Sequence, residues 1–429
     1  MNGPSGSLRL ALFSDGDLPL LGGVAHETVE HLVDAVRERG GDVRVFASFT
    51  RDADLERGIT EAVPGVPFWS FPEIRITAPA RARATQVLAA WRPTLVHAAT
   101  PFGIGLAGRG AARALGIPFV TAYQPELVAY TSGVGLAALR RPGFAFLRWF
   151  HNGGARTYCP SRAAAAELRA HGVERLAVWT PGVDVGTFHP LNRSSALRER
   201  IGADGSTFVV ASSARLALAD GFDVACRVMH LVQQTSTRRI LWVVAGTGPD
   251  AARCRAAAPA GPVFLGELDR GAAGAFHATA DLFLSTATGA HVGPGVMESM
   301  ASGVPVLAAN SQAARELLGG MRGATATAND VEAIALRLIS LAGDTRERAV
   351  LRDHALSYVR RHSAQHAVDD LVASFERITR DSRARARAVR PSGEVPIATF
   401  LEPGLADAHP ATPKSPMRES PRPHPTPRA

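Results

Sequence analysis

Residues 281–307 hold the residue types best suited to binding a ligand. An apolar run with strand character leads into a glycine-rich loop, a short helix that carries Glu298, a tight turn and a second apolar run. Gly293, Pro294 and Gly295 predict a loop whose backbone N–H groups, together with the positive end of the helix dipole, hold an anion such as a phosphate. A glutamate on a helix surface is commonly just solvated, so Glu298 alone does not identify the ligand.

A second glycine pair follows the first predicted strand. Gly22 and Gly23 stand just ahead of a helical pattern over residues 26–39. Because glycine has no side chain, the pair lets the backbone approach a phosphate or a sugar closely, and it is equally typical of a flexible turn.

These loops need strands and helices to position them, and two stretches of the chain predict such a scaffold. Short apolar runs alternate with helical patterns, which is typical of a parallel, doubly wound sheet with ligands at the carboxyl ends of its strands. The first stretch predicts strands over 8–13, 43–47, 94–97, 117–122 and 173–179, with helices over 26–39, 80–91, 105–115 and 163–171, the last capped by Ser161. The second predicts strands over 207–212, 240–245, 263–265 and 281–285, with helices over 221–234, 250–257, 271–278, 330–342, 344–361 and 364–380.

The fold class is therefore α/β, with two Rossmann-like domains. We place them at residues 1–188 and 189–362, followed by a helix over 363–380 and a tail over 381–429. The tail is rich in proline and arginine and poor in aromatic residues, so it cannot bury enough apolar surface to fold and is expected to be disordered. Such a tail is either simply solvated or binds a partner's groove.

Composition limits the classes of function. The net charge of +8 is spread along the chain without a basic helix that alternates with aromatic residues, so we expect no nucleic-acid partner. The three cysteines are widely spaced and are expected to be buried thiols, with no metal site. No apolar run is long enough to span a membrane and no signal peptide is evident, so the cytoplasm is the expected location.

Residues 97–130 are similar to family-four GT-B mannosyltransferases, as are 147–161 and the linker 180–190. The resemblance covers roughly residues 8–378 and implies two Rossmann-like domains facing across a cleft, with the helix over 363–380 crossing back to the first domain. It also implies an acceptor side at Tyr123, Gln124, Glu126 and Tyr130. Gln124 stands where the family has a histidine, and an amide cannot exchange a proton.

The same resemblance implies a donor site in the second domain. Arg215 matches the family's phosphate-binding arginine, while Asp220 stands where the family has a lysine. Glu298 matches the glutamate that holds the ribose diol, while Ala290 stands in place of a second glutamate. The implied donor-binding set is Gly22, Gly23, Arg215, Gly246, Gly248, Leu268, Gly293, Pro294, Gly295 and Glu298. The candidate catalytic residues are Arg215, Glu298 and Gln124.

For three further residues in these segments we expect structural roles. His151 lies in an apolar helical stretch and is more typical of a structural histidine than of a catalytic one. Asp184 and His189 lie in the linker and are expected to be hinge and turn residues.

The resemblance predicts a retaining glycosyltransferase that uses a nucleotide-sugar donor, first of all GDP-mannose, and no obligatory cofactor or metal. The acceptor would be a carbohydrate or a lipid, and peripheral contact with the inner face of a membrane is one expectation, with Arg140, Arg141 and Arg148 as a candidate patch. The changes at Gln124, Asp220 and Ala290 also allow a catalytically impaired relative that binds a nucleotide, glycan or protein and has a regulatory role. Another GT-B chemistry, such as epimerisation, is a third reading.

Overall fold

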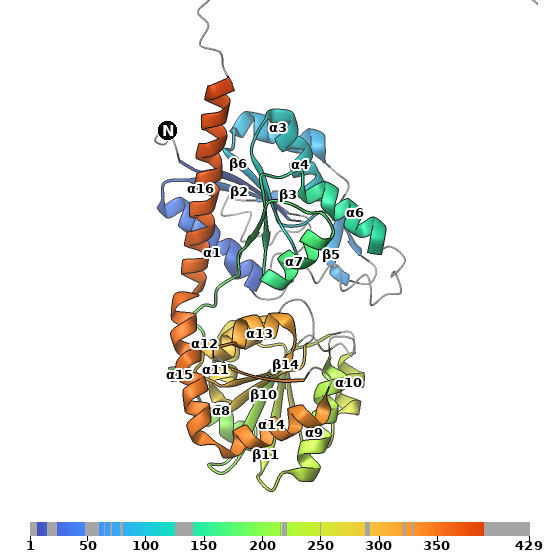
Figure 1. Cartoon of the computed structure of the whole chain (residues 1–429), viewed down its shortest axis with the longest axis vertical. Coiled ribbons are helices and arrows are strands. Elements are labelled where there is room, and N and C mark those ends of the chain that lie inside the picture. Colours follow the sequence, from blue (N-terminus) through green and yellow to red (C-terminus); the bar gives the residue numbers. More distant parts are fainter. Residues whose placement is uncertain are drawn as a thin grey trace, which may run out of the picture. The chain divides into compact units, whose positions relative to one another are not determined.

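The computed structural model describes residues 7–14, 24–47, 60–63, 65–68, 71–77, 80–124, 140–214, 216, 221–248, 250–287, 292–320, 323–327 and 330–389. Contacts divide the chain into two units, residues 1–385 and 386–429, and only the backbone of 386–389 is described in the second. The larger unit contains two parallel sheets, each with helices on both of its faces (Figure 1).

The first sheet has seven parallel strands in the order β3-β2-β1-β6-β7-β8-β9. Its strands are β1 (Arg9–Ser14), β2 (Asp42–Ala47), β3 (Thr60–Ala62), β6 (Leu95–Ala98), β7 (Phe119–Ala122), β8 (Arg156–Cys159) and β9 (Leu176–Val178). The helices between them are α1 (Val24–Glu38), α3 (Arg81–Trp91), α4 (Gly103–Leu115), α6 (Arg140–His151) and α7 (Arg162–Ala170). A separate antiparallel hairpin comprises β4 (Gly65–Phe68) and β5 (Phe71–Thr77).

Alternating side chains of the central strand explain why both faces of this sheet are covered. In β1, Leu10 and Leu12 belong to one buried apolar cluster, whereas Ala11 and Phe13 belong to another. Successive strand residues point to opposite faces, so an uninterrupted apolar strand needs helices on each side. The sequence therefore predicted a doubly wound sheet correctly.

The second sheet has six parallel strands in the order β12-β11-β10-β13-β14-β15. Its strands are β10 (Phe208–Ser213), β11 (Ile240–Ala245), β12 (Val263–Gly266), β13 (Leu282–Ser285), β14 (Val306–Asn310) and β15 (Ala324–Thr327). Its helices are α8 (Ser195–Arg200), α9 (Phe222–Thr235), α10 (Ala251–Ala257), α11 (Arg270–Thr279), α12 (Pro294–Ala301), α13 (Gln312–Leu318), α14 (Val331–Gly343) and α15 (Thr345–Arg361), with a short 3-10 turn η2 (Pro190–Asn192) ahead of them.

We call the first sheet with its helices the first half of the protein, and the second sheet with its helices the second half. The last helix, α16 (Ala364–Val389), follows the second half in sequence but packs on the first sheet (Figure 1). Val368, Leu371 and Phe375 are buried in the same cluster as Leu10 and Leu12 of β1. The hydroxyl groups of Tyr158 and Ser374 lie 2.7 Å apart and add a polar contact across this interface. The predicted helix that returns to the first half is therefore present.

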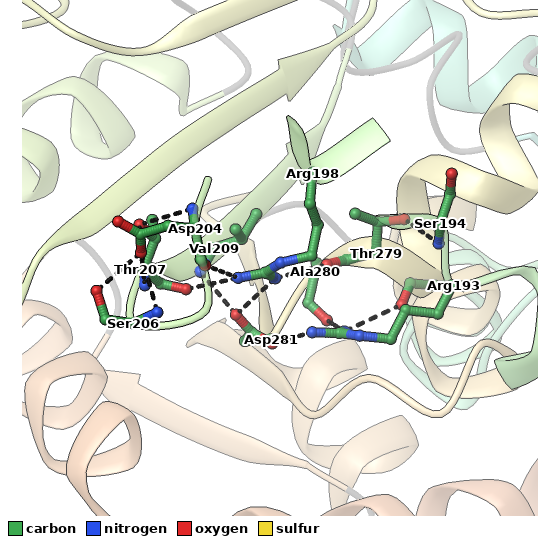
Figure 2. Close-up of polar contacts among 11 residues, drawn as sticks. Arg193, Ser194, Arg198, Asp204, Ser206, Thr207, Val209, Thr279, Ala280 and Asp281 are labelled. Carbon is green, nitrogen blue, oxygen red and sulfur yellow. Dashed lines mark hydrogen bonds and ion pairs between the residues drawn. The ribbon is translucent and has the colours of Figure 1, made fainter. Parts of the chain in front are cut away.

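An ion-pair network fixes the amino-terminal edge of the second sheet (Figure 2). The Asp281 carboxylate lies 2.7 Å from Arg193 and 3.2 Å from Arg198, and it accepts a hydrogen bond of 2.9 Å from the backbone N–H of Val209. Arg198 also donates to the Thr207 carbonyl oxygen at 2.7 Å. These bonds join the start of β13, the start of β10 and the segment before β10 at the edge opposite the strand ends that usually bind ligands.

The described elements differ from the predicted ones at one helix end and in several short elements. The helix expected to end at residue 380 continues to Val389, because the alternating arginines and alanines from Arg383 onward favour helix. The predicted tail loses these helical residues, and residues 390–429 lie outside the description. Short elements were not predicted, because their runs give too weak a periodic signal: strands β3, β8 and β15, the hairpin β4–β5, and helices α8 and α13.

The predicted cap at Ser161 and the predicted buried thiols are confirmed. The Ser161 side chain accepts a 3.0 Å hydrogen bond from the Ala164 N–H at the start of α7. Cys159, Cys226 and Cys254 are buried, unpaired thiols. None of the described helices is both long enough and apolar enough to cross a bilayer.

The linker residues Asp184 and His189 both form turns. The Asp184 carboxylate accepts hydrogen bonds from the Gly186 and Thr187 N–H groups at 2.9 and 3.2 Å. His189 Nδ1 accepts one from the Leu191 N–H at 3.2 Å and caps η2. Burial raises the pKa of Asp184, but its hydrogen bonds from Thr187, Arg270 and Gly186 outweigh that effect and bring the pKa to about 2.

Candidate functional site

The strand order places a switch point between β10 and β13 of the second sheet. After β10 the chain enters α9, whose residues pack on one face, and after β13 it enters α12, whose residues pack on the other. Because the two connections diverge, the carboxyl ends of these neighbouring strands leave a crevice between them, the usual ligand position in such sheets. The loops that surround this position contain most of the described donor-site residues.

Gly246 and Gly248 bring the loop after β11 against the loop after β10. Gly246 has a φ of +118°, and a Cβ there would lie 2.1 Å from the Ala214 carbonyl oxygen. A Cβ on Gly248 would lie 2.6 Å from the Leu216 carbonyl oxygen, and the Leu216 N–H donates to the Thr247 carbonyl oxygen at 3.0 Å. The structure thus gives both glycines a role in close packing of the backbone, while their contact with a donor stays a prediction.

Gly221 makes a similar contact on the other side of β10. Its φ is +90°, and a Cβ there would lie 2.5 Å from the Thr286 carbonyl oxygen, just past β13. The start of α9 and the loop after β13 are therefore pressed together at the switch point.

Leu268, which the resemblance places in the donor-binding set, lies in the loop between β12 and α11. Its side chain is half-buried against the apolar cluster under α12. The Gly266 carbonyl oxygen accepts a 2.7 Å hydrogen bond from the Gly246 N–H, so this loop is tied to the glycine loop after β11.

The helix α12 begins earlier than the sequence predicts. Gly293 precedes the helix, while Pro294 and Gly295 are its first two residues and not part of a loop. Proline is favoured at this position because its φ is already helical and no N–H is needed there. Pro294 therefore offers no N–H to an anion, which corrects the predicted three-residue anion loop. A Cβ on Gly295 would lie 2.1 Å from Ser213 Oγ, so glycine allows the helix to approach the end of β10.

Glu298 lies on α12, and its side chain is 19% exposed. One carboxylate oxygen, Oε2, lies 3.0 Å from Nε2 of His277, and the other nitrogen of that ring lies 2.7 Å from Ser299 Oγ. Glu298 is therefore held by a buried neighbour, unlike a solvated surface glutamate. Sequence reasoning did not identify His277, because nothing in the Ala- and Gly-rich segment of α11 indicates which face meets α12.

The two described residues of the predicted acceptor side have different environments. Tyr123 is 4% exposed, and its hydroxyl donates to Glu167 Oε2 at 3.1 Å. The Tyr123 hydroxyl thus contributes to packing within its own half, and its place on the acceptor side stays a prediction. Gln124 is partly exposed, and its amide oxygen is buried with no hydrogen-bond partner in the part of the chain that the structure describes. Gln124 stays a candidate for binding a hydroxyl group.

His151 has the surroundings of a structural histidine. It is 1% exposed, and its Nδ1 lies 2.8 Å from Thr121 Oγ1. Burial lowers the pKa of His151 to about 4, which keeps the ring neutral at physiological pH.

Seven of the predicted site residues lie outside the described residues: Gly22, Gly23, Glu126, Tyr130, Arg215, Asp220 and Ala290. Their roles stay predictions. Among the described residues, no group of three or more histidine, cysteine, aspartate or glutamate side chains is placed to hold a metal ion.

Comparison with known proteins gives this geometry a context. Residues 21–187 match the family model for glycosyltransferase family 4, and residues 194–358 match that for glycosyl transferases group 1. A GDP-mannose-dependent alpha-mannosyltransferase of Mycolicibacterium smegmatis is 31% identical over 73% of this chain and 83% of the relative. A protein of the same description from Corynebacterium glutamicum is 30% identical over 70% of this chain and 72% of the relative.

A solved structure supports the same fold at lower sequence identity. HepE of Anabaena, in complex with UDP and glucose, superposes with a TM-score of 0.67 at 18% identity, covering 86% of this chain and 98% of that one. At this identity the likeness concerns the fold alone, which is the GT-B arrangement of two Rossmann-like halves. With both family models matched and relatives near 31% identity over most of their length, the chain belongs to the family 4, group 1 glycosyltransferases.

Proposed function

We propose that this chain is a retaining hexosyltransferase that moves mannose from GDP-mannose to a carbohydrate or lipid acceptor. The observation that carries the proposal is the position of Glu298. This residue lies on α12, beside the end of β10, and its carboxylate is held by His277 of α11. The chain is also about 31% identical to GDP-mannose-dependent mannosyltransferases. The match between that glutamate and the ribose-binding glutamate of the family gives the carboxylate its proposed ligand.

In this proposal the second half binds the donor. Glu298 accepts hydrogen bonds from the ribose hydroxyl groups, and the loop that contains Gly246 and Gly248 lies against the diphosphate. Leu268 borders the base. Arg215 neutralises the charge that develops on the diphosphate as it departs, the kind of stabilisation that contributes most to such reactions. The proposal assigns no metal ion to the site.

The reaction exchanges one bond at the anomeric carbon for another. The bond from C1 of the hexose to the β-phosphate oxygen breaks, and a bond from C1 to the acceptor oxygen forms on the same face. The acceptor's hydroxyl proton leaves with the diphosphate. Gln124 would contribute a hydrogen bond to a sugar hydroxyl, because an amide donates and accepts hydrogen bonds but does not take up a proton at neutral pH.

Calorimetric titration with GDP-mannose, GDP, UDP-glucose and UDP tests the donor site, followed by an assay for donor hydrolysis. We expect micromolar binding of GDP and GDP-mannose, with slow hydrolysis in the absence of an acceptor. Glu298→Gln should weaken nucleotide binding about tenfold, because a charged acceptor is replaced by a neutral amide. The matched control, Glu199→Gln on the exposed face of α8, should bind like the wild type. If none of the four compounds binds, the proposal is overturned and the reading as an impaired relative is favoured.

We also infer peripheral contact with an anionic membrane through the outer face of α6, at the inner face of the cytoplasmic membrane. Arg140, Arg141 and Arg148 line a cavity of about 480 Å³ together with Phe144 and His171. On the same helix Trp149 is 51% exposed. Arginine side chains near an exposed tryptophan suit the interface between lipid headgroups and water. This surface would bring the protein to a lipid acceptor.

A further inference from the structure

The side chain of His277 is enclosed on all sides that the structure describes. It is 2% exposed, and the rings of Phe188, Phe276 and Phe283 lie around it at centroid distances of 5.6, 5.0 and 5.4 Å. The imidazole cannot turn without moving these rings, since protein interiors are closely packed. Its two nitrogens therefore point in fixed directions.

Both of those nitrogens have a polar partner. Nδ1 lies 2.7 Å from Ser299 Oγ, and Nε2 lies 3.0 Å from Glu298 Oε2. A carboxylate only accepts hydrogen bonds, so Nε2 must carry the hydrogen on that side. A neutral ring then has an acceptor at Nδ1, which the Ser299 hydroxyl satisfies by donating. For a ring that carries one proton, the network thus assigns the Nε2–H tautomer, with the Ser299 hydroxyl donating to Nδ1.

The hydroxyl of Ser299, the imidazole of His277 and the carboxylate of Glu298 are linked in the same sequence as the groups of a hydrolytic triad, but their burial excludes that chemistry. Ser299 is 0% exposed, on the inner side of α12. No substrate atom can reach its oxygen, which a nucleophile requires. Of the three residues, Glu298 alone is partly exposed, at 19%, so its carboxylate is the group that can meet a ligand.

We propose that His277 is a positioning residue that fixes the Glu298 carboxylate for a nucleotide's ribose diol, with Ser299 fixing His277 in turn. Holding Oε2 by one hydrogen bond leaves Oε1 free to accept from a hydroxyl group, and it removes the rotational freedom that binding would otherwise have to restrict. The inference rests on the proposed function, because the ribose ligand of Glu298 comes from it.

The first test measures the tautomer directly and requires no ligand. In the ¹⁵N-labelled full chain, NMR chemical shifts of the His277 ring should identify Nε2 as the protonated nitrogen at neutral pH, and Ser299→Ala should reduce the population of that tautomer. A ring protonated at Nδ1 in the wild type would overturn the arrangement, whatever the protein's activity.

The second test compares the binding of GDP with that of 2′,3′-dideoxy-GDP, which lacks the diol. We expect the wild type to prefer GDP, and His277→Phe to reduce this preference on the order of tenfold, since a hydrogen bond to a charged group is lost. His277→Gln, which keeps an N–H donor, should recover part of it. The double variant His277→Phe/Glu298→Ala should match Glu298→Ala alone, because His277 acts through Glu298.

A matched control replaces another buried histidine, His97→Phe in the first half, and should leave the preference unchanged. A folded His277→Phe variant with the wild-type preference would overturn the inference while the proposed function stands. Absence of nucleotide binding by the wild type would overturn the proposed function and the ribose role together, and the tautomer measurement would still decide the arrangement of the three side chains.

Discussion

The carbonyl oxygen of Ala214 lies only 2.1 Å from the point where a Cβ on residue 246 would stand. Only glycine fits at this position, where the loops after β10 and β11 meet. The contact is between backbone atoms, so it cannot be relieved by turning a side chain, and the φ of +118° adds strain for any other residue.

Gly246→Ala should therefore lower the free energy of unfolding by about 2–4 kcal/mol and weaken nucleotide binding. Urea denaturation and calorimetry of the same samples measure the two effects. The control is Gly205→Ala, where a Cβ would meet nothing within 4 Å. Equal stability of the two variants would show that the loops separate easily.

Asp281 should be one of the residues on which the stability of the second half depends most. Asp281→Ala removes the partner of Arg193 and Arg198 and the acceptor for the Val209 N–H (Figure 2). Because the Arg198 side chain is only 15% exposed, its unpaired charge should cost about 2–4 kcal/mol, measured by urea denaturation. Arg253→Ala removes an exposed ion pair with Asp250 and should change stability by less than about 1 kcal/mol.

Acid should destabilise the first half through two buried histidines. Burial lowers the pKa of His97 and of His151 from the ordinary 6.5 to about 4. Between these values the unfolded chain binds protons that the folded protein does not, so stability falls as the pH drops from about 6.5 towards 4. Each histidine should contribute a loss of about 2 kcal/mol between pH 7 and pH 5.

His97→Phe tests this effect, because it removes one titrating group and keeps a ring against Phe375 and Tyr158. Between pH 7 and pH 5 the variant should lose about 2 kcal/mol less stability than the wild type in urea denaturation. His354→Phe, on an exposed position of α15, should keep the wild-type dependence. A parallel fall in all three proteins would assign the acid sensitivity to other groups.

The proposed membrane surface on α6 predicts charge-dependent binding to vesicles. Replacing Arg140, Arg141 and Arg148 with serine should reduce cosedimentation with phosphatidylglycerol vesicles at least tenfold, because each basic residue contributes about 1 kcal/mol near an anionic surface. The matched control makes the same charge change at three exposed arginines of α15: Arg352, Arg360 and Arg361. Equal losses in both variants would indicate a response to net charge without a defined surface.

The altered family positions make a prediction about turnover. Asp220→Lys places a cation where the resemblance expects one and should raise the rate of donor hydrolysis, because a cation stabilises the departing diphosphate. Asp250→Lys, after the neighbouring loop, makes the same change of charge at a position with no such expectation. An unchanged rate in Asp220→Lys would remove position 220 from the donor site.

The fold was more accessible from the sequence than the site. Strand and helix patterns are local, so the parallel sheets and the Ser161 cap could be predicted from neighbouring residues. The returning helix came from the resemblance, and only its end was misplaced. The His277–Glu298 contact joins α11 and α12 across 21 residues, and no periodicity specifies which of their faces meet. The hydrogen bond between Tyr123 and Glu167 could not be predicted for the same reason, because Glu167 lies 44 residues further along the chain.

The contribution of α16 to the core of the first half has a consequence for synthesis on the ribosome. Residues 7–178 leave the ribosome with all seven strands of their sheet. The apolar surface that Val368, Leu371 and Phe375 cover stays exposed until nearly 200 further residues have been translated. During that interval the nascent first half exposes an aggregation-prone apolar surface, which makes it a candidate substrate for chaperones. A gene fragment that ends after β9 would lack this helix permanently, so separate expression of the first half should yield aggregates unless α16 is supplied as a second chain.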